Sequence, residues 1–190
     1  MLKIRTLEQS DLGPLKAFTD REIGAGYYSE TELSDIFRRS SKSGVMCSLL
    51  LCAADGRIEG VRFSFPPGNW SHGKGQGLNP EKWPHGLNET AYFQSLFLSA
   101  NVQGHGWGGK ISSASIEILK RAGAKGIACH SWKQSPHGSS TRYLQKLGFK
   151  KVAEHAEYWK EVNYNCTICL TPPCRCTAEE MYLDLEEKNA

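Results

Sequence analysis

Hydrophobic and polar residues alternate with the two-residue period of β-strands in several parts of the chain. Residues 2–7 alternate in this way, residues 46–54 form a near-continuous apolar run, and residues 61–65 alternate again. Asp55-Gly56, between the last two segments, is typical of a tight hairpin turn. The pattern therefore predicts a short first strand and, later, an antiparallel pair of strands.

Helical spacing of apolar residues appears between these strand segments. Leucine, phenylalanine and isoleucine recur at helical intervals over residues 12–23 and again over residues 33–37. Ser10 or Asp11 can cap the first helix, and Ser29-Glu-Thr-Glu32 forms a capping box for the second. We expect two helices between the first strand and the antiparallel pair.

An apolar strand over residues 91–99 runs into a glycine-rich turn, which opens a helix with an apolar face over residues 111–122. Four glycines occupy the turn and the helix start: Gly104, Gly106, Gly108 and Gly109. They let the backbone approach a ligand with no side chain in the way. The first N–H groups of a helix have no internal partners, and the helix dipole there favours an anion. Together, these features predict a phosphate-binding site.

Three phosphate-binding motifs overlap at this turn. A mononucleotide P-loop needs Ser or Thr after its Gly-Lys, and Ile111 stands in that place. Residues 104–109 fit the dinucleotide pattern G-x-G-x-x-G. A dinucleotide-binding turn should follow the first strand of a βαβ unit and precede an acidic residue that binds the ribose, whereas this turn lies mid-chain with no acidic residue at the right spacing. Residues 103–108 match Q/R-x-x-G-x-G/A, the pyrophosphate-binding signature of the GNAT superfamily of N-acetyltransferases, and this interpretation fits best.

The chain resembles the GNAT family in a second segment. Thr141–Phe149 is similar to that family's R-F-Y-E-K-L-G-F sequence. The resemblance implies an α/β fold with a mixed, mostly antiparallel central sheet flanked by helices, formed by a single domain over residues 1–190. The remaining elements are expected as strands over 125–132, 149–153 and 181–185 and a helix over 136–146.

The resemblance also implies acetyl-CoA as the co-substrate. It implies that Phe97 and Leu98 pair through their backbones with the pantetheine arm, and that the Leu98 N–H polarises the thioester carbonyl. The pyrophosphate is expected on the glycine turn, formed by Gln103, Gly104, His105, Gly106, Trp107, Gly108 and Gly109. Gln103 is neutral, so it would add a hydrogen bond rather than a charge.

The acid and base of direct acyl transfer are less clearly marked. The family's usual acid is a tyrosine where this chain has Leu144; Tyr143 stands one residue earlier, about 100° away around a helix, and is either the acid or a core aromatic residue. His137 stands where the family often has Asn, and it either relays a proton or lies at the surface before the helix. His130, at the end of the preceding strand, is the other candidate base, because residues 91–99 contain no carboxylate.

Residues 66–89 form a long irregular stretch that contains Trp70, His72, Trp83 and His85. Loops of this length are usually functional or disordered, and two tryptophans argue against disorder. By its place in the GNAT order, the stretch is either a wall of the acceptor pocket or an insertion that packs on itself.

The seven cysteines form two groups. Cys47, Cys52 and Cys129 lie in apolar segments and are interpreted as small buried residues. The other four lie within eleven residues: Cys166, Cys169, Cys174 and Cys176. Four thiolates at this spacing suit tetrahedral Zn²⁺, which predicts a structural zinc knuckle over residues 164–178, inserted before the last strand. An iron–sulfur cluster or a redox dithiol is the alternative.

The composition is that of an ordinary globular domain. The chain has 190 residues, 39% of them hydrophobic, and 23 basic against 20 acidic residues give a net charge of +3, which does not favour nucleic acid or a membrane surface as a partner. The first residues have no signal-peptide core, and no apolar run approaches the length of a membrane span, so we expect a cytoplasmic protein.

The predicted function is acetyl transfer from acetyl-CoA to an amine. A small amine or an amino acid is favoured over a protein as the acceptor, and a homodimer is left open. The alternative is a non-catalytic acyl-CoA-binding or sensing module, which gains weight from Leu144 and from the missing strand carboxylate.

Overall fold

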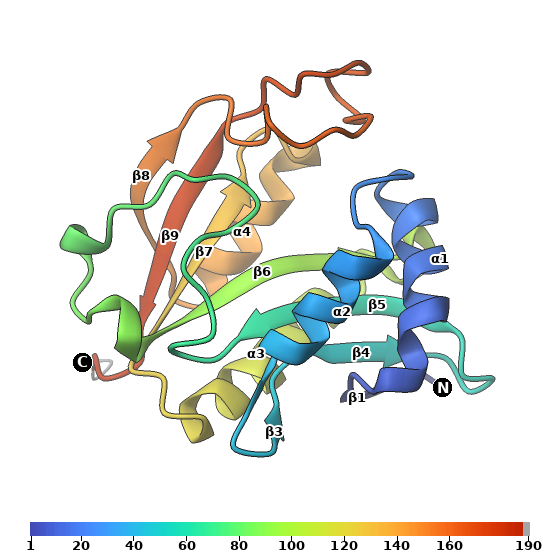
Figure 1. Cartoon of the computed structure of the whole chain (residues 1–190), viewed down its shortest axis with the longest axis horizontal. Helices are drawn as coiled ribbons and strands as arrows, with labels where there is room; N and C mark the ends of the chain where they lie inside the picture. Colours follow the sequence, from blue (N-terminus) through green and yellow to red (C-terminus); the bar gives the residue numbers. More distant parts are fainter. Residues whose placement is uncertain (188–190) are drawn as a thin grey trace.

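Residues 1–187 are described by the structure, a computed structural model, and they form a seven-stranded sheet with helices on both faces (Figure 1). The strand order is β1-β4-β5-β6-β7-β9-β8, in which the β6–β7 pair is parallel and the other pairs are antiparallel. The strands are β1 (Lys3–Thr6), β4 (Leu49–Cys52), β5 (Ile58–Phe65), β6 (Thr90–Leu98), β7 (Gly126–Trp132), β8 (Lys150–His155) and β9 (Ala178–Asp184). This mixed, mostly antiparallel sheet confirms the predicted fold class.

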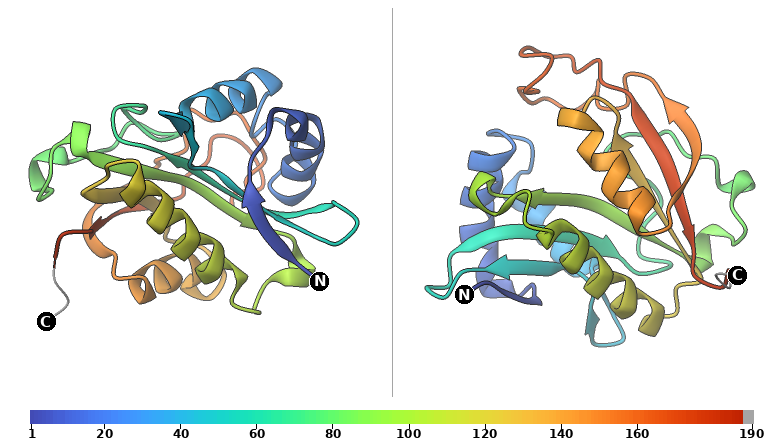
Figure 2. Two further views of the ribbon diagram at one scale, coloured as in Figure 1. Left: turned by 90° about the horizontal axis from the view of Figure 1, so that it is seen from below. Right: turned by 180° about the vertical axis from the view of Figure 1, so that it is seen from behind.

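Two helices cover each face of the sheet (Figure 2). One face carries α1 (Leu12–Glu22) and α2 (Glu30–Arg39), and the other carries α3 (Trp107–Arg121) and α4 (Ser139–Lys146). A small hairpin of β2 (Ser41–Lys42) and β3 (Val45–Met46) follows α2. Within residues 1–187, no helix is both long and apolar enough to cross a membrane.

The two predicted helix starts differ in their chemistry. At α2 the capping box is formed as predicted: Ser29 Oγ accepts from the Glu32 N–H (3.1 Å), and Glu32 returns a bond to the Ser29 N–H (2.9 Å). Asp11 does not cap α1. Its carboxylate instead binds the Arg5 guanidinium at 2.6 and 2.7 Å and accepts from the Glu8 N–H, so it ties β1 to the turn before α1.

The helix predicted over residues 136–146 begins later than expected. Residues 136–138 form a single 3-10 turn, in which His137 and Gly138 have φ values of 55° and 62°, and α4 starts at Ser139. Positive φ at two successive residues cannot belong to a right-handed helix, so the chain turns there before the helix starts.

A polar layer changes the buried face of α3. Within the apolar face predicted over residues 111–122, Ile111 and Leu119 are buried and Ala114 and Ile118 are half-buried against the core, but Ser112, Ser115 and Ile116 are buried as well. The reason lies in β5, whose polar residues Arg62 and Ser64 face α3 and bond to these serines. Both faces of β5 are covered, so its polar residues are buried as deeply as its apolar ones.

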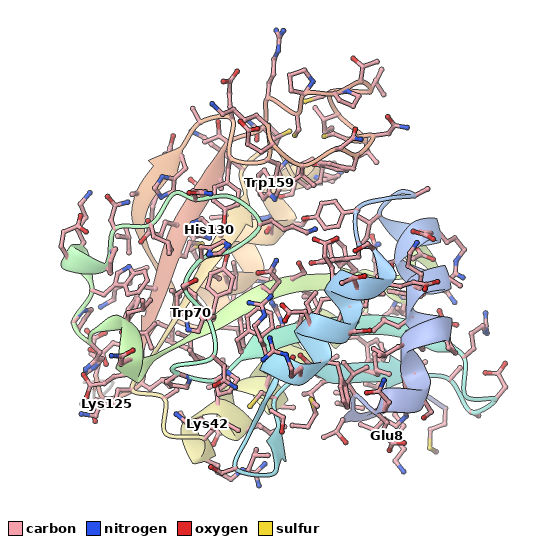
Figure 3. All side chains as sticks on the ribbon, viewed as in Figure 1. Glu8, Lys42, Trp70, Lys125, His130 and Trp159 are labelled. Carbon is pink, nitrogen blue, oxygen red and sulfur yellow. The ribbon has the colours of Figure 1, made fainter. Side chains whose placement is uncertain are left out.

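Residues 66–89 lie across the α1–α2 face of the sheet (Figures 1 and 3), and Trp70 and Trp83 within the stretch also lie near each other, with ring centroids 6.1 Å apart. Trp70 stacks on Tyr92 of β6 with ring centroids 4.5 Å apart, and Trp83 stacks on Tyr182 of β9 at 5.5 Å. Both tryptophans are buried, and they belong to the same hydrophobic core as the residues of α1 and α2.

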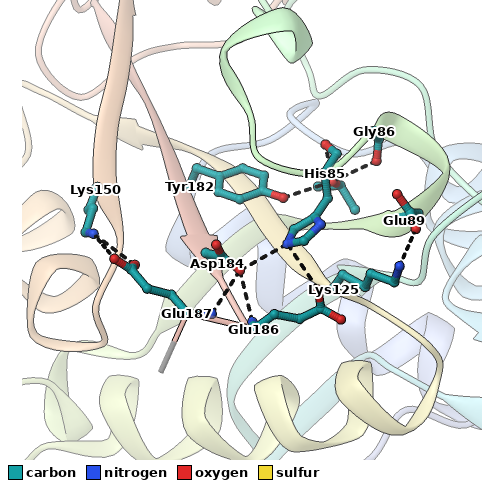
Figure 4. Close-up of polar contacts among 10 residues, drawn as sticks. His85, Gly86, Glu89, Lys125, Lys150, Tyr182, Asp184, Glu186 and Glu187 are labelled. Atoms are coloured by element: carbon teal, nitrogen blue, oxygen red, sulfur yellow. Dashed lines mark hydrogen bonds and ion pairs between the residues drawn. The ribbon is translucent and has the colours of Figure 1, made fainter. Parts of the chain in front are cut away.

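Polar contacts fasten the end of this stretch to the sheet (Figure 4). His85 Nε2 lies 3.1 Å from Asp184 Oδ1 at the end of β9, and Lys125, just before β7, pairs with Glu89 at 2.6 Å. These contacts draw together the chain entering β6, the chain entering β7 and the chain leaving β9.

Candidate active site

β6 separates from β7 halfway along its length (Figure 1). The two strands pair from Thr90 to Phe93 of β6, and β6 then continues to Leu98 with no described strand on that side. The pairing of β6 with β5 has an irregularity at Gln94, at the point of separation. One wall of the resulting V-shaped opening is therefore a strand edge that pairs with no described strand.

The hydrogen-bond register shows which residues of β6 face the opening. The Ser99 N–H donates to Glu59 O of β5 at 2.9 Å. Because backbone groups alternate in direction along a strand, Phe97, two residues earlier, also turns its N–H and C=O toward β5. Leu96 and Leu98, which alternate with these residues, turn their N–H and C=O groups to the opening. In this register the backbone groups of Leu96 and Leu98, rather than those of Phe97, face the opening, and the pairing of Phe97 with the pantetheine arm remains a prediction.

The glycine turn lies at the open end of β6. Gly104 and Gly106 have φ values of 76° and 78°, the left-handed region that favours glycine, and a Cβ added to either would meet no protein atom within 4 Å. Gly106 is the residue before α3, and no side chain caps the first N–H groups of this helix. The turn presents unpaired N–H donors to solvent on the side where the strand edge is free.

The side chains of the turn are arranged around this edge. Gln103 donates its side-chain N–H to Leu98 O at 2.8 Å, and His105 Nδ1 donates to Gln103 O at the same distance. Lys110, in the first turn of α3, holds its ammonium group 4.4 Å above the Trp107 ring. Lys110 also brings a positive charge to the helix start, a contribution that the GNAT motif over residues 103–108 does not include.

Tyr143 reaches from α4 toward the sheet. Its hydroxyl accepts a hydrogen bond from Arg62 Nη2 at 2.5 Å, and burial raises the pKa of Tyr143 against the opposing effect of Arg62. Leu144, in the position of the family's tyrosine, is 2% exposed and belongs to the apolar core. His137 is exposed in the turn before α4. The structure thus brings Tyr143, and not His137, into contact with the interior.

His130 lies on the α1–α2 face near Trp70 (Figure 3), enclosed by polar groups. Its Nε2 donates to Gly77 O at 2.6 Å, so its Nδ1 is an acceptor and takes hydrogen bonds from the hydroxyls of Tyr92 (2.6 Å) and Tyr158 (3.1 Å). Burial lowers the pKa of His130 to about 4. At neutral pH it is an uncharged ring that holds residues 66–89 to the sheet.

A buried carboxylate fastens the same stretch. Glu180 is fully buried and accepts from the Asn79 N–H (3.1 Å), Asn79 Nδ2 (2.8 Å), Trp83 Nε1 (2.8 Å) and His155 Nε2 (2.7 Å). These bonds lower its pKa although burial alone would raise it. One ligand atom each of His130, His155 and Glu180 lies within 4.8 Å of the others, but protein groups already use the Glu180 oxygens. The cluster therefore fits an anchor better than a metal site.

A groove of about 400 Å³ lies between α2 and this stretch. Glu32 and Asp35 of α2 and Gln94 at the β6 irregularity line it, with Lys74 opposite. Lys74 Nζ binds Glu32 at 2.6 Å and Tyr27 O at 2.7 Å, and its bonds with Glu32 hold the pKa of that carboxyl below its usual value despite burial. Gln94 is thus next to both the groove and the β6–β7 opening.

The four clustered cysteines come together in the connection between β8 and β9. Their sulfur atoms all lie within 4.8 Å of one another, and Cys176 Sγ is 3.7 Å from Cys166 Sγ and 3.8 Å from Cys169 Sγ. Tetrahedral Zn²⁺ with bonds of about 2.3 Å separates its sulfur ligands by about 3.8 Å. The thiols are free, and the set therefore fits a closed tetrahedral metal site.

The cysteine segment packs on the connection between α1 and α2. The Tyr164 ring meets the Tyr27 ring edge to face at 4.8 Å, and the Tyr164 hydroxyl donates to Cys174 Sγ at 3.4 Å. Three of the cysteines belong to the same core cluster as Tyr27 and Tyr28. The segment thus supports the chain that leads into α2 and its groove.

Comparison of the structure with solved structures places these features in a known fold. The chain is similar to the ribosomal-protein-S18-alanine N-acetyltransferase from Escherichia coli (14% identity, TM-score 0.67, covering 100% of this chain and 97% of that one). A putative acetyltransferase from Salmonella typhimurium, solved with acetyl-CoA, matches at 17% identity and TM-score 0.67 over 100% and 97% of the two chains. A chain of the NatC complex bound to Gag peptide and CoA matches at 12% identity and TM-score 0.69 over 97% and 98%. At these identities the similarity establishes the fold, and it confirms the resemblance to GNAT proteins at that level.

Neither a protein-family model nor a curated protein sequence matches the chain.

Proposed function

We propose that this protein is an acetyl-CoA-dependent N-acetyltransferase. The observation that carries the proposal is the free edge of β6 beside an exposed left-handed glycine turn that starts α3. A thioester co-substrate needs both parts: a strand edge for its amide-containing arm and unpaired N–H donors for its pyrophosphate. The acetyl-CoA-bound neighbour from Salmonella typhimurium supports the choice of co-substrate.

In this proposal, Leu96 and Leu98 offer their backbone groups to the pantetheine arm, and the Leu98 N–H polarises the thioester carbonyl. Residues 103–109 hold the pyrophosphate, with Lys110 adding a positive charge. Binding would compete for Leu98 O with the Gln103 side chain, which would then be free to turn toward the phosphates. Tyr143 supplies the proton for the leaving thiolate.

The acceptor enters from the α1–α2 face. The groove of about 400 Å³ beside Gln94 has the volume of a small-molecule site, and because Lys74 and Arg39 balance its carboxylates Glu32 and Asp35, its size rather than its charge bears on the acceptor. We therefore favour a small amine or an amino acid as the substrate. The low pKa of His130, about 4, makes it a weak base at neutral pH, so the amine proton leaves to water through the groove, and we assign no catalytic role to His130 or His137.

The four-cysteine set holds one structural Zn²⁺ in this proposal. Cys166, Cys169, Cys174 and Cys176 would complete a tetrahedral shell with no open position, so the ion would take no part in catalysis. Its contribution would be to order residues 164–178 against Tyr27.

A turnover assay tests the proposed reaction. Acetyl-CoA is incubated with a panel of primary amines, amino acids and short peptides with free N-termini, and released thiol is measured alongside calorimetry of CoA binding. We expect CoA to bind and to be released in an amine-dependent way. Binding without release for any acceptor would favour the non-catalytic acyl-CoA-binding module, and absence of binding would contradict both.

A further inference from the structure

Arg62 is a buried cation with no anion beside it. It is 2% exposed, yet within residues 1–187 it pairs with no carboxylate: Nη2 donates to Ser112 Oγ (2.9 Å) and to the Tyr143 hydroxyl (2.5 Å), and Nε has no partner. The guanidinium lies 4.1 Å from the Phe93 ring centre. A buried charge costs several kcal/mol of desolvation unless an opposite charge balances it.

The titratable groups around Arg62 do not supply that opposite charge. Burial raises the pKa of the Cys129 thiol on β7 to about 12, although Arg62 acts to lower it. Burial also raises the pKa of Tyr143 on α4. Both groups are therefore uncharged at neutral pH, and Ser112 of α3 does not titrate. The unbalanced cation points to a negative charge that is brought or formed there during function.

The position of Arg62 indicates which charge this is. It pairs in register with Leu96, whose backbone faces the β6–β7 opening, and it packs on Phe93, the last residue of β6 that pairs with β7. Arg62 thus lies at the apex of the opening, between α3 and α4. Its hydrogen bond occupies a lone pair of the Tyr143 oxygen, which leaves the hydroxyl proton directed away from Arg62.

We propose that Arg62 is the positioning residue that makes Tyr143 the acid for the leaving CoA thiolate. This role rests on the proposed acetyl transfer. As the N–C bond forms and the C–S bond breaks, the electron pair leaves on sulfur, and the Tyr143 O–H passes its proton to it. The adjacent guanidinium stabilises both the thiolate and the resulting phenolate. Water returns a proton to Tyr143, balancing the proton that the amine gives up to solvent.

Arg62→Met and Ser64→Ala form a matched pair for the test. Ser64 makes the neighbouring buried bridge from β5 to α3, to Ser115 Oγ at 2.8 Å, but carries no charge. We expect Arg62→Met to lower kcat roughly tenfold to a hundredfold with little change in KM for acetyl-CoA, and Ser64→Ala to leave both unchanged. Because an apolar residue removes the unbalanced charge, Arg62→Met should fold with equal or greater stability.

A second readout follows the thiol of bound CoA directly. Its ultraviolet thiolate absorbance is titrated in complexes with the wild type, Arg62→Met and Ser64→Ala. We expect the thiol to titrate about one pH unit higher in Arg62→Met than in the other two. Equal titration in all three, or an unchanged kcat in Arg62→Met, would overturn the role of Arg62 alone. Failure of the wild type to bind CoA would overturn the proposed function and this role with it.

Discussion

The two faces of the sheet are built in different ways. On the α3–α4 side, the glycine turn and the open strand edge come from residues 96–109, which are adjacent in the sequence and act through the backbone. On the α1–α2 side, the groove is made by α2, residues 66–89 and Gln94, and the cysteine segment packs on the α1–α2 connection. A site formed by the backbone of one segment can be recognised from a local sequence motif. A site formed by segments far apart in the sequence has no such motif and is recognised only in the folded structure.

The two sides also differ in the interactions that stabilise their structure. The α1–α2 side depends on buried polar anchors, such as Glu180 and His130, and on the four-cysteine cluster. The glycine turn needs only a backbone conformation that glycine adopts freely. Damage to one side should therefore leave the other intact, and the following changes test that separation.

The largest effect is expected from removal of a cysteine ligand. Cys174→Ser should abolish zinc binding and lower the free energy of unfolding by about 4 kcal/mol, because loss of a structural metal leaves its loop without a core. Elemental analysis should find about one zinc per chain in the wild type and none in the variant. CoA affinity should stay within about twofold.

Cys52→Ser is the control, since Cys52 is buried but lies in β4, outside the cluster. It should retain its zinc. Iron with visible absorbance would show that the site holds an iron–sulfur cluster rather than zinc. A metal-free wild type with four reactive thiols in this segment would disprove the metal site.

The second effect is a dependence of stability on pH. The pKa of His130 falls from about 6.5 when unfolded to about 4 in the fold, so the unfolded chain binds more protons between these values. Stability should be complete above pH 6.5 and fall by about 3 kcal/mol as the pH drops to 4. His130→Gln should flatten this part of the profile, measured by denaturant unfolding at each pH. An equally steep profile in the variant would show that another group is responsible.

The same contrast explains what the sequence could predict. The glycine turn, the capping box at Ser29 and the strand pattern are local signals, and the structure contains the elements they predict. Arg62 gave no such signal, because a polar residue in an alternating strand ordinarily faces solvent, and only α3 and α4 together bury it. Glu180 was missed for a related reason: β9 begins at Ala178, three residues before the predicted strand, where residues 66–89 cover it.

The third effect concerns the glycine turn. Gly106→Val should weaken CoA binding by about a hundredfold, because a β-branched side chain disfavours φ of 78° and projects where the pyrophosphate is proposed to lie. Gly44→Val is a matched control: Gly44 also has φ of 78° and open space around its added Cβ, but it lies in the β2–β3 hairpin. Both variants should lose similar stability, and calorimetry should find weaker CoA binding only in Gly106→Val. Equal losses of affinity would mean that strain, not position, is the cause.

The smallest effect is expected at Lys74, which fastens residues 66–89 to the start of α2. Its side chain is 11% exposed and binds Tyr27 O and Glu32. Lys74→Met should keep the packing of the stem but lose these bonds, lowering the free energy of unfolding by about 1 kcal/mol. Amide hydrogen exchange should rise over residues 71–77 and leave residues 103–110 unchanged. Lys42→Met is the control, since Lys42 bonds to Pro67 O at the other end of the stretch, away from the groove. Equal exchange over residues 71–77 in the wild type and Lys74→Met would show that the groove wall is held without Lys74, by the Glu180 and His130 anchors alone.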